Sequence, residues 1–305
     1  MVTVVGSLNI DYLASVRRLP HPGETVHAIG FFQRFGGKGA NQAIAAARQG
    51  SLVTMIGCVG SEPEGRAYLV RLRKEGIRTN GVSVVKNSRT GSAMIVVDQH
   101  GENTIVVAAG ANGELTGSMV TSNQKHILSS KMLLVQLEVG IPAVSEAVRI
   151  ANRAGIPVVL NASPIRDDLP WGKWKLDTVI VNESEALAIF GPQPRKVSDR
   201  YLAKKGIETL IITRGARSTI VASRLERLEI PTAEIQPVDT VGAGDAFTGT
   251  YVSRRAEGSS VASAVCQANC AGALATLKFG AQESIPTRRE TERVLRPPNY
   301  TGLHL

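Results

Sequence analysis

Residues 131–160 read KMLLVQLEVGIPAVSEAVRIANRAGIPVVL and contain two apolar runs separated by a segment that begins with proline. The runs at Lys131–Leu137 and Pro157–Leu160 predict buried strands, and Pro142–Ala154 predicts a helix with proline in its first turn. A strand, a helix and a second strand in direct succession form a crossover unit in which the two strands run parallel.

The same alternation continues on both sides of this unit. The further strands and helices that it predicts are Val2–Gly6, Lys38–Gln49, Leu52–Cys58, Pro63–Lys74, Thr178–Val181, Glu183–Phe190 and Thr209–Thr213. Repeated units of this kind form a mainly parallel sheet with helices on both faces, so we expect one three-layer α/β/α domain over residues 1–305.

Two regions interrupt the alternation. Thr25–Arg34 and Thr90–Val107 contain stretches of period two, and His100–Asn103 predicts a turn within the second region. Antiparallel strands that project from an α/β body form a flap, which we expect over about residues 11–34 and 90–107. A flap that covers a cleft excludes water during group transfer.

The composition argues against several classes of protein. The net charge is +9, but the basic residues are scattered and aromatic residues make up only 4%, so we expect no nucleic-acid partner. No apolar run approaches the roughly 18 residues of a membrane span, and no basic region precedes the apolar N-terminal stretch, so we expect neither a membrane association nor a signal peptide. Three cysteines are a poor disulfide framework, which favours the cytoplasm.

The segment Gly36-Gly37-Lys38-Gly39-Ala40-Asn41 comes directly before the alanine-rich helix. Glycines let a ligand approach the backbone, and the start of a helix offers free N–H groups. The segment does not fit the Walker A pattern, and Gln42 stands where the dinucleotide fingerprint has its third glycine. It is therefore either a ligand-binding loop of another kind or only the turn that starts a helix.

A second glycine-containing segment, Asp239–Phe247 (DTVGAGDAF), precedes another long apolar helix. Gly242 and Gly244 predict N–H groups that converge at the positive end of that helix, where they would stabilise negative charge on a transferring phosphoryl group. Asp245 lies at the same place, and its carboxylate can accept a proton from a hydroxyl group. The alternative is that Asp245 only caps the helix.

Two strand ends carry further polar groups. Asn182–Glu185 follows a strand of the parallel sheet, where Glu185 either orients a hydrated Mg²⁺ or forms a capping box with Asn182. Ile211–Ala216 ends in a glycine turn, which either cradles phosphates or forms a hairpin with Ser218–Ala222.

Taken in order, these motifs resemble the ribokinase/PfkB family of carbohydrate kinases over nearly the whole chain. Gly36–Gly50 (GGKGANQAIAAARQG) and Asp239–Gly249 (DTVGAGDAFTG) are similar to the two signatures of that family, and Asn182–Glu185 is similar to its NxxE motif. Further segments that resemble the family are Gly6–Asp11, Pro22–Thr25, Gln136–Glu138 and Gly280–Ser284. The resemblance implies a ribokinase-like fold and a kinase that transfers a phosphoryl group from ATP, with Mg²⁺, to the 5-hydroxyl of D-ribose.

The resemblance also implies a role for individual residues. The sugar would be held by Asn9, Asp11, Gly37, Lys38, Gly39, Ala40, Asn41 and Glu138. The nucleotide site would contain Asn182, Thr213, Arg214, Gly215, Ala216, Arg217, Ser218, Gly244, Asp245 and Asn269. The anion hole would consist of Gly242, Ala243, Gly244 and Asp245, with Asp245 as the base.

Two kinds of metal ion are implied as well. The resemblance places K⁺ on the side chains of Asp239 and Ser284 and on the carbonyl groups of Val241, Ala275, Lys278 and Gly280. Mg²⁺ would accompany ATP and be oriented, through water, by Glu185. Two features depart from the family pattern. The family prefers glycine at the position of Ser218, and the stretch Phe190–Arg200 is shorter than usual in the family.

Two alternatives to ribose phosphorylation remain at this point. One is a sibling kinase for another pentose, a ketohexose or a nucleoside, although the polar pair Asn9 and Asp11 favours a free sugar. The other is a non-catalytic sugar-sensing protein, against which the intact Gly242, Gly244 and Asp245 argue. The apolar period-two strands of the flap also predict a homodimer formed through the flap.

Overall fold

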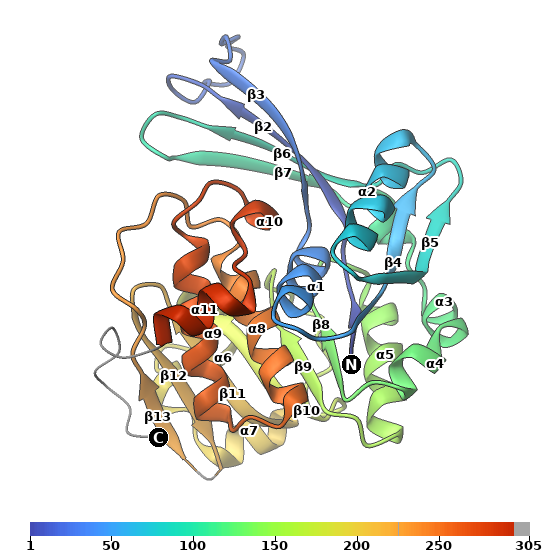
Figure 1. The fold of residues 1–305 in the computed structure, drawn as a ribbon, viewed down its shortest axis with the longest axis vertical. Helices are drawn as coiled ribbons and strands as arrows, with labels where there is room; N and C mark the ends of the chain where they lie inside the picture. The colour runs from blue at the N-terminus through green and yellow to red at the C-terminus, as the bar shows by residue number, and fades with distance from the viewer. Residues whose placement is uncertain (225, 296–305) are drawn as a thin grey trace.

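The computed structural model describes residues 1–224 and 226–295, so residues 225 and 296–305 of the expected domain lie outside the described part. Its main feature is a nine-stranded sheet in the order β13-β12-β11-β10-β9-β8-β1-β4-β5 (Figure 1). The strands from β11 to β5 are all parallel, and β12 and β13 add antiparallel strands at one edge. The bounds are β1 Val2–Val5, β4 Val53–Gly60, β5 Arg78–Val85, β8 Met132–Val135, β9 Val158–Asn161, β10 Leu176–Asn182, β11 Ile207–Arg214, β12 Arg217–Ser223 and β13 Arg227–Ile230.

Helices cover both faces of this sheet, as the alternation predicts. One layer contains α1 Lys38–Arg48, α2 Pro63–Lys74, α8 Ala243–Glu257 and α9 Val261–Ala275, with α11 Arg288–Leu295 against α9. The other contains α3 Gly117–Ser122, α4 Gln124–Leu128, α5 Ile141–Arg153, α6 Glu183–Phe190 and α7 Asp199–Lys205. The short elements are η1 Gly110–Glu114, η2 Pro194–Lys196 and α10 Ala281–Ser284.

Neighbouring residues of the central strands point to opposite faces and enter separate cores. Val4 packs with α1 and α8, whereas Val5 packs with α5. On β8, Leu134 belongs to the same core as Val4, and Leu133 belongs to the same core as Val5. This burial on both faces explains why the parallel strands are continuous apolar runs in the sequence. The three-layer α/β/α architecture is thereby confirmed.

A separate four-stranded sheet in the order β3-β2-β6-β7 forms the flap and projects from the body (Figure 1, top). Its strands are β2 Asn9–Ser15, β3 Gly30–Gly36, β6 Gly91–Val97 and β7 Asn103–Ala108. The outer pairs are antiparallel as expected, but β2 and β6 pair in parallel. The reason lies in the connections: β2 follows β1 and β6 follows β5, so both leave the same carboxyl edge of the parallel sheet.

The predicted boundaries agree closely with the observed ones. The bounds of α2 and α6 are those expected from the sequence, and the other predicted elements differ by a few residues. Residues 25–29, expected within the flap strands, precede β3 and form no strand. Arg214 pairs with Arg217 across the β11–β12 turn, so the hairpin alternative for this segment is confirmed. No helix in the described ranges is long and apolar enough to cross a membrane.

Candidate active site

The N-terminus of α8 lies at the carboxyl edge of the parallel strands. Gly242 precedes the helix with a φ of 81°, a left-handed conformation that favours glycine. A Cβ atom there would also lie 2.8 Å from the Cα atom of Ala281, so α10 leaves no room for a side chain. Gly244, by contrast, faces open space. The backbone N–H of Ala243 donates to the carbonyl of Thr240 at 3.3 Å, so the first turn offers the N–H groups of Gly244 and Asp245 to a ligand on the open side.

The carboxylate of Asp245 is held by two neutral side chains of α1. Its Oδ2 accepts a hydrogen bond of 2.9 Å from Nδ2 of Asn41, and its Oδ1 accepts one of 2.8 Å from Nε2 of Gln42. Asp245 is 8% exposed and lines a cavity, so its carboxylate remains open to a substrate on one side. Each carboxylate oxygen can accept more than one hydrogen bond, which leaves capacity for a hydroxyl group.

The start of α1 brings the candidate sugar residues together. A Cβ atom on Gly39 would lie 2.4 Å from the backbone nitrogen of Ser7, so α1 rests directly on the end of β1. Glu138, which follows β8, accepts hydrogen bonds from the backbone N–H of Lys38 at 2.9 Å and from the Ser7 hydroxyl at 2.5 Å. Both bonds use Oε2 of Glu138, which leaves the acceptor capacity of its Oε1 for another donor.

Asp11 lies at the base of the flap, beside the same helix. A Cβ atom on Gly36 would lie 1.9 Å from Oδ2 of Asp11, so the glycine makes space for this carboxylate. Burial, together with the nearby charges of Glu138, Asp245 and Glu283, raises the pKa of Asp11 to about 7. The carboxyl group therefore changes charge near neutral pH.

Asn9 is oriented by a residue that the sequence did not single out. Nδ2 of Asn112 donates to Oδ1 of Asn9 at 2.7 Å and to the carbonyl of Leu8, while Oδ1 of Asn112 accepts from the Leu8 N–H. Oδ1 of Asn9 is therefore occupied by Asn112, and the NH₂ group of Asn9 points away from Asn112.

Lys38 supplies positive charge to the site. Burial lowers the pKa of Lys38, but the carboxylates of Asp245, Glu138 and Glu185 outweigh it, and the net effect is a raised pKa. The ammonium group is therefore protonated and lies among three acidic groups. An anionic ligand with a metal ion can enter such a mixed environment.

A cavity of about 120 Å³ joins these elements. Its lining residues are Lys38, Asn161, Ser163, Ile180, Val181, Asn182, Glu185, Thr213, Gly242, Gly244, Asp245 and Thr248. Asn182 and Glu185 form the capping box at the start of α6, so this interpretation of the pair is confirmed. Both residues also line the cavity, and the role of Glu185 toward Mg²⁺ stays a prediction.

A second cavity of about 460 Å³ continues from the first and shares Asn182, Thr213 and Gly244 with it. Most of its lining is apolar or small; the further residues that line it are Gly215, Ala216, Thr219, Thr232, Ala233, Ile235, Pro237, Thr240, Ala243, Phe247, Asn269, Gly272, Ala273 and Thr276. Its size and apolar walls suit a planar organic group.

Three predicted nucleotide residues are placed differently. Arg214 and Ser218 contact each other and Glu229, and Arg217 pairs with Glu183; none of the three lines either cavity. The antiparallel hairpin alternates its side chains, which turns these groups toward acidic partners on the neighbouring strand and helix.

Asn269 does line the larger cavity, but its amide is already engaged. Its Nδ2 donates to the carbonyl groups of Ile230 and Pro231, and its Oδ1 accepts from Thr219 at 2.6 Å. The residue therefore holds the end of β13 against α9 and supports the cavity wall.

Three of the residues expected to hold a monovalent cation lie close together. Asp239 accepts hydrogen bonds from the backbone N–H of Val241 at 3.0 Å and of Gly280 at 2.9 Å, so it joins the α8 turn to the loop before α10. Ser284 is buried beside this loop. The ammonium of Lys278 lies 3.6 Å from Glu290 and its side chain is 60% exposed, so this charge points to solvent.

Comparison with known proteins gives a consistent result. Residues 1–288 match the family described as pfkB family carbohydrate kinase. The chain belongs to this family. It is 38% identical over 301 residues to a ribokinase of Haemophilus influenzae, covering 95% of this chain and 96% of the relative. Two solved structures, a ribokinase from Thermotoga maritima (31% identity) and an Arabidopsis thaliana ribokinase complexed with ribose and ATP (26% identity), each superpose with a TM-score of 0.88; they cover 96% and 97% of this chain and 98% of their own.

This carbohydrate kinase has several site residues that the sequence did not reveal. Asn161 and Ser163 line the smaller cavity and Asn112 contacts Asn9, but each of the three is an isolated polar residue without a motif. Thr248 also lines the smaller cavity and stands inside the second signature. Gln42 stands inside the first signature and contacts Asp245. Its position in GGKGANQ was the available signal.

Proposed function

We propose that this carbohydrate kinase transfers the γ-phosphoryl group of ATP to the 5-hydroxyl of D-ribose. The observation that carries the proposal is the position of Asp245 and the α8 N-terminus at the point where the two cavities meet. The larger cavity takes the nucleoside part of ATP, and the smaller one takes the phosphates. Ribose lies under the flap, between α1 and β2.

In this reaction Asp245 receives the proton of the sugar hydroxyl as the oxygen attacks the γ-phosphorus. The new bond joins the sugar oxygen to phosphorus, the bond to the leaving oxygen of ADP breaks, and negative charge spreads over the transferring oxygens. The N–H groups at the start of α8 and the ammonium of Lys38 stabilise this charge. Asp11, Asn9 and Glu138 fix the sugar so that the correct hydroxyl faces Asp245.

Mg²⁺ fits the smaller cavity through Glu185. One oxygen of Glu185 accepts the backbone N–H of Asn182 at 2.8 Å, which leaves the other oxygen for the water shell of a metal ion. Mg²⁺ keeps several waters and prefers oxygen ligands. When bound with ATP, it would neutralise charge between the phosphate groups.

K⁺ suits the oxygen donors expected around Asp239. The proposed ligand set is one carboxylate, the Ser284 hydroxyl and the carbonyl groups of Val241, Ala275, Lys278 and Gly280, and such hard oxygen donors suit this ion. Support comes from the bonds of Asp239 to Val241 and Gly280, which place the turn and the loop side by side. The ion would fix the direction of the turn that precedes the anion hole.

A homodimer formed through the flap is also part of the proposal, as is a cytoplasmic location based on the sparse cysteines. By strand register, Met94 and Val106 lie on one face of the flap, and Phe32, Ile105 and Val107 lie on the other. All five side chains are exposed, and β7 leaves an unpaired edge. A second copy of the chain would cover such a surface.

A coupled assay of ADP release over pentoses, ketohexoses and nucleosides tests the substrate. We expect the highest kcat/KM with D-ribose, and mass and NMR spectra that show a 5-phosphate. A clear preference for 2-deoxyribose, a ketohexose or a nucleoside would replace ribose as the substrate, and the absence of ADP release with every acceptor would favour a sensor.

A further inference from the structure

Gln42 connects the base to the carboxyl edge of the sheet without reaching the cavity itself. The side chain is fully buried on α1. Its Nε2 donates to Oδ1 of Asp245 at 2.8 Å and to Oδ1 of Asn161 at 2.9 Å, and its Oε1 accepts from Nε2 of Gln136 at 2.8 Å. One amide therefore joins α8 to the ends of β8 and β9.

The direction of these hydrogen bonds follows from Asp245. An ionised carboxylate only accepts, so Gln42 must turn its NH₂ group toward Asp245 and its oxygen toward Gln136. Gln136 must then donate, and its own Oε1 is buried without a partner among the described residues. The Gln42 and Gln136 amides thus adopt the orientation that directs a donor at Asp245, although this orientation leaves Oε1 of Gln136 without a partner among the described residues.

The spacing between α1 and α8 leaves Gln42 little freedom. A Cβ atom on Gly249 would lie 2.4 Å from the carbonyl oxygen of Gln42 and 2.5 Å from Cβ of Ala45, so the two helices are in direct backbone contact. Close packing of the two helices thus sets the distance between α1 and Asp245, and the side-chain amide of Gln42 spans this distance.

We propose that Gln42 is a positioning residue that holds the carboxyl group of Asp245 turned toward the sugar hydroxyl. Gln42 donates to one carboxylate oxygen, and Asn41, at the edge of the sugar site, donates to the other. Because Gln42 is buried, it acts only through Asp245. This inference rests on Asp245 being the base of the proposed reaction.

The charged groups around Asp245 are the same in all variants considered below. Lys38 of α1 faces it with a positive charge, and Asp11 of β2, Glu138 after β8 and Glu185 of α6 contribute negative charge nearby. A change in the pH profile after a substitution at position 42 therefore reports on the new neighbour of Asp245.

The decisive variant is Gln42→Glu, which keeps the shape and replaces the donor by a second carboxyl group. Two carboxyl groups at this distance share a proton, which disables the base until the pH is high enough to remove it. We expect kcat at pH 7 to fall about ten- to a hundredfold. The acid limb of the kcat profile should move up by about one pH unit or more, while KM for ribose stays within about threefold.

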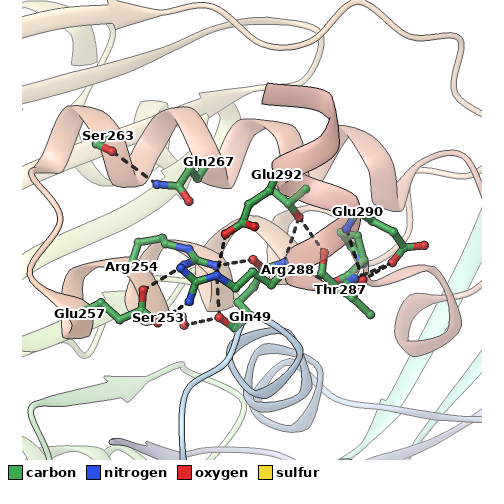
Figure 2. Close-up of polar contacts among 12 residues, drawn as sticks. Gln49, Ser253, Arg254, Glu257, Ser263, Gln267, Thr287, Arg288, Glu290 and Glu292 are labelled. Carbon is green, nitrogen blue, oxygen red and sulfur yellow. Dashed lines mark hydrogen bonds and ion pairs between the residues drawn. The ribbon is translucent and has the colours of Figure 1, made fainter. Parts of the chain in front are cut away.

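Gln49→Glu is the matched control on the same helix. Gln49 is equally buried, but it contacts Arg254 at the far end of α1 (Figure 2). It also donates to the carbonyl of Pro286 and to the hydroxyl of Thr291. Its carboxylate would lie beside the Arg254 guanidinium, away from Asp245. This variant should retain the wild-type kcat and acid limb, whatever its melting temperature.

Gln42→Met is a second variant that removes the donor without adding charge. It should lower kcat at every pH, with a smaller shift of the acid limb and with ribose binding by calorimetry preserved. A wild-type kcat and an unshifted acid limb in folded Gln42→Glu would overturn the inference, and so would loss of ribose binding in step with kcat in Gln42→Met. Near wild-type turnover of Asp245→Asn would instead remove the base itself, so the two failures are distinguishable.

Discussion

Acidic residues crowd one small part of this kinase. Asp11, Glu138, Glu185 and Asp245 come from four different segments of the chain, and each affects the pKa of a neighbour. Lys38 lies among them with positive charge. The site therefore gains from a bound cation, which agrees with the proposed entry of ATP together with Mg²⁺.

Asp245→Asn tests the base directly. The substitution keeps the shape of the side chain but removes the proton acceptor, and loss of a general base typically lowers the rate by ~10²–10⁴. We expect kcat to fall by this amount in a steady-state assay, while calorimetry shows little change in ribose affinity. Turnover close to that of the wild type would exclude Asp245 from proton transfer.

Asp11 makes the free energy of unfolding depend on pH. The folded protein holds a proton on Asp11 up to about pH 7, whereas the unfolded chain releases it near 3.8. The unfolded state thus binds fewer protons in this window, so stability falls as the pH rises through it, and the loss is complete above the folded pKa. Asp11→Asn removes this loss, and we expect it to stabilise the protein by about 1–2 kcal/mol at pH 8.

Urea unfolding at pH 4 and pH 8 measures this effect. At pH 4 the variant and the wild type should be nearly equal, because Asp11 is then largely neutral in the folded state. Asp167→Asn, at an exposed position, serves as the control. An equal difference between Asp11→Asn and wild type at both pH values would contradict the assignment.

At the level of elements, the sequence predicted the parallel sheet and its helices because both leave local patterns. The apolar runs of β8 and β9 and the proline at the start of α2 are examples. The parallel pairing of β2 with β6 had no such pattern, since it depends on which edge of the body both strands leave. Register across distant segments cannot be read from period two alone.

The residues of the site also fall into those that a local sequence pattern predicts and those that it does not. Gly242, Gly244 and Asp245 could be found because they stand together in one motif at a helix start. Arg214, Arg217 and Ser218 were included as neighbours in sequence, but the hairpin turns their side chains toward Glu229 and Glu183. Asn112 reaches Asn9 across 103 positions, and no local pattern predicts such a contact.

The loop before α10 belongs to the proposed cation site, and two substitutions separate its parts. Asp239→Ala removes the carboxylate that joins Val241 to Gly280, so we expect it to abolish the advantage of K⁺ over Na⁺. In the wild type that advantage should be about fivefold or more in kcat, because the ion aims the anion-hole donors.

Lys278→Ala is the control for this prediction. Its ammonium lies beside Glu290, so only the carbonyl group, which the substitution keeps, belongs to the proposed ligand set. The K⁺ response should therefore persist in Lys278→Ala. Equal wild-type rates in the two salts at constant ionic strength and saturating MgATP would rule out a functional cation site.

At the scale of the whole molecule, the flap exposes apolar side chains on the described surface. Met94 and Val106 are 53% and 55% exposed and lie opposite each other on neighbouring strands. Met94→Asp places a charge in the middle of this apolar face, and we expect it to weaken dimer formation at least about tenfold, as judged by sedimentation velocity.

Leu128→Asp is a suitable comparison, because Leu128 is 52% exposed at the end of α4, away from the flap. It should leave the oligomeric state as in the wild type. A wild type that is monomeric at micromolar concentrations, or a dimer that tolerates Met94→Asp, would contradict assembly through the flap.

The close contact of α1 with α8 has a consequence for how the protein is made. Asn41 donates a hydrogen bond to Asp245, which is 204 positions away, and accepts one from Gln282, which is 241 positions away. During translation α1 leaves the ribosome long before either partner exists, so its buried face stays uncovered while most of the remaining chain is synthesised. We therefore expect chaperones to bind the nascent chain over this interval. We also expect that ribose does not stabilise the nascent chain until the second signature, Asp239–Gly249, has left the ribosome.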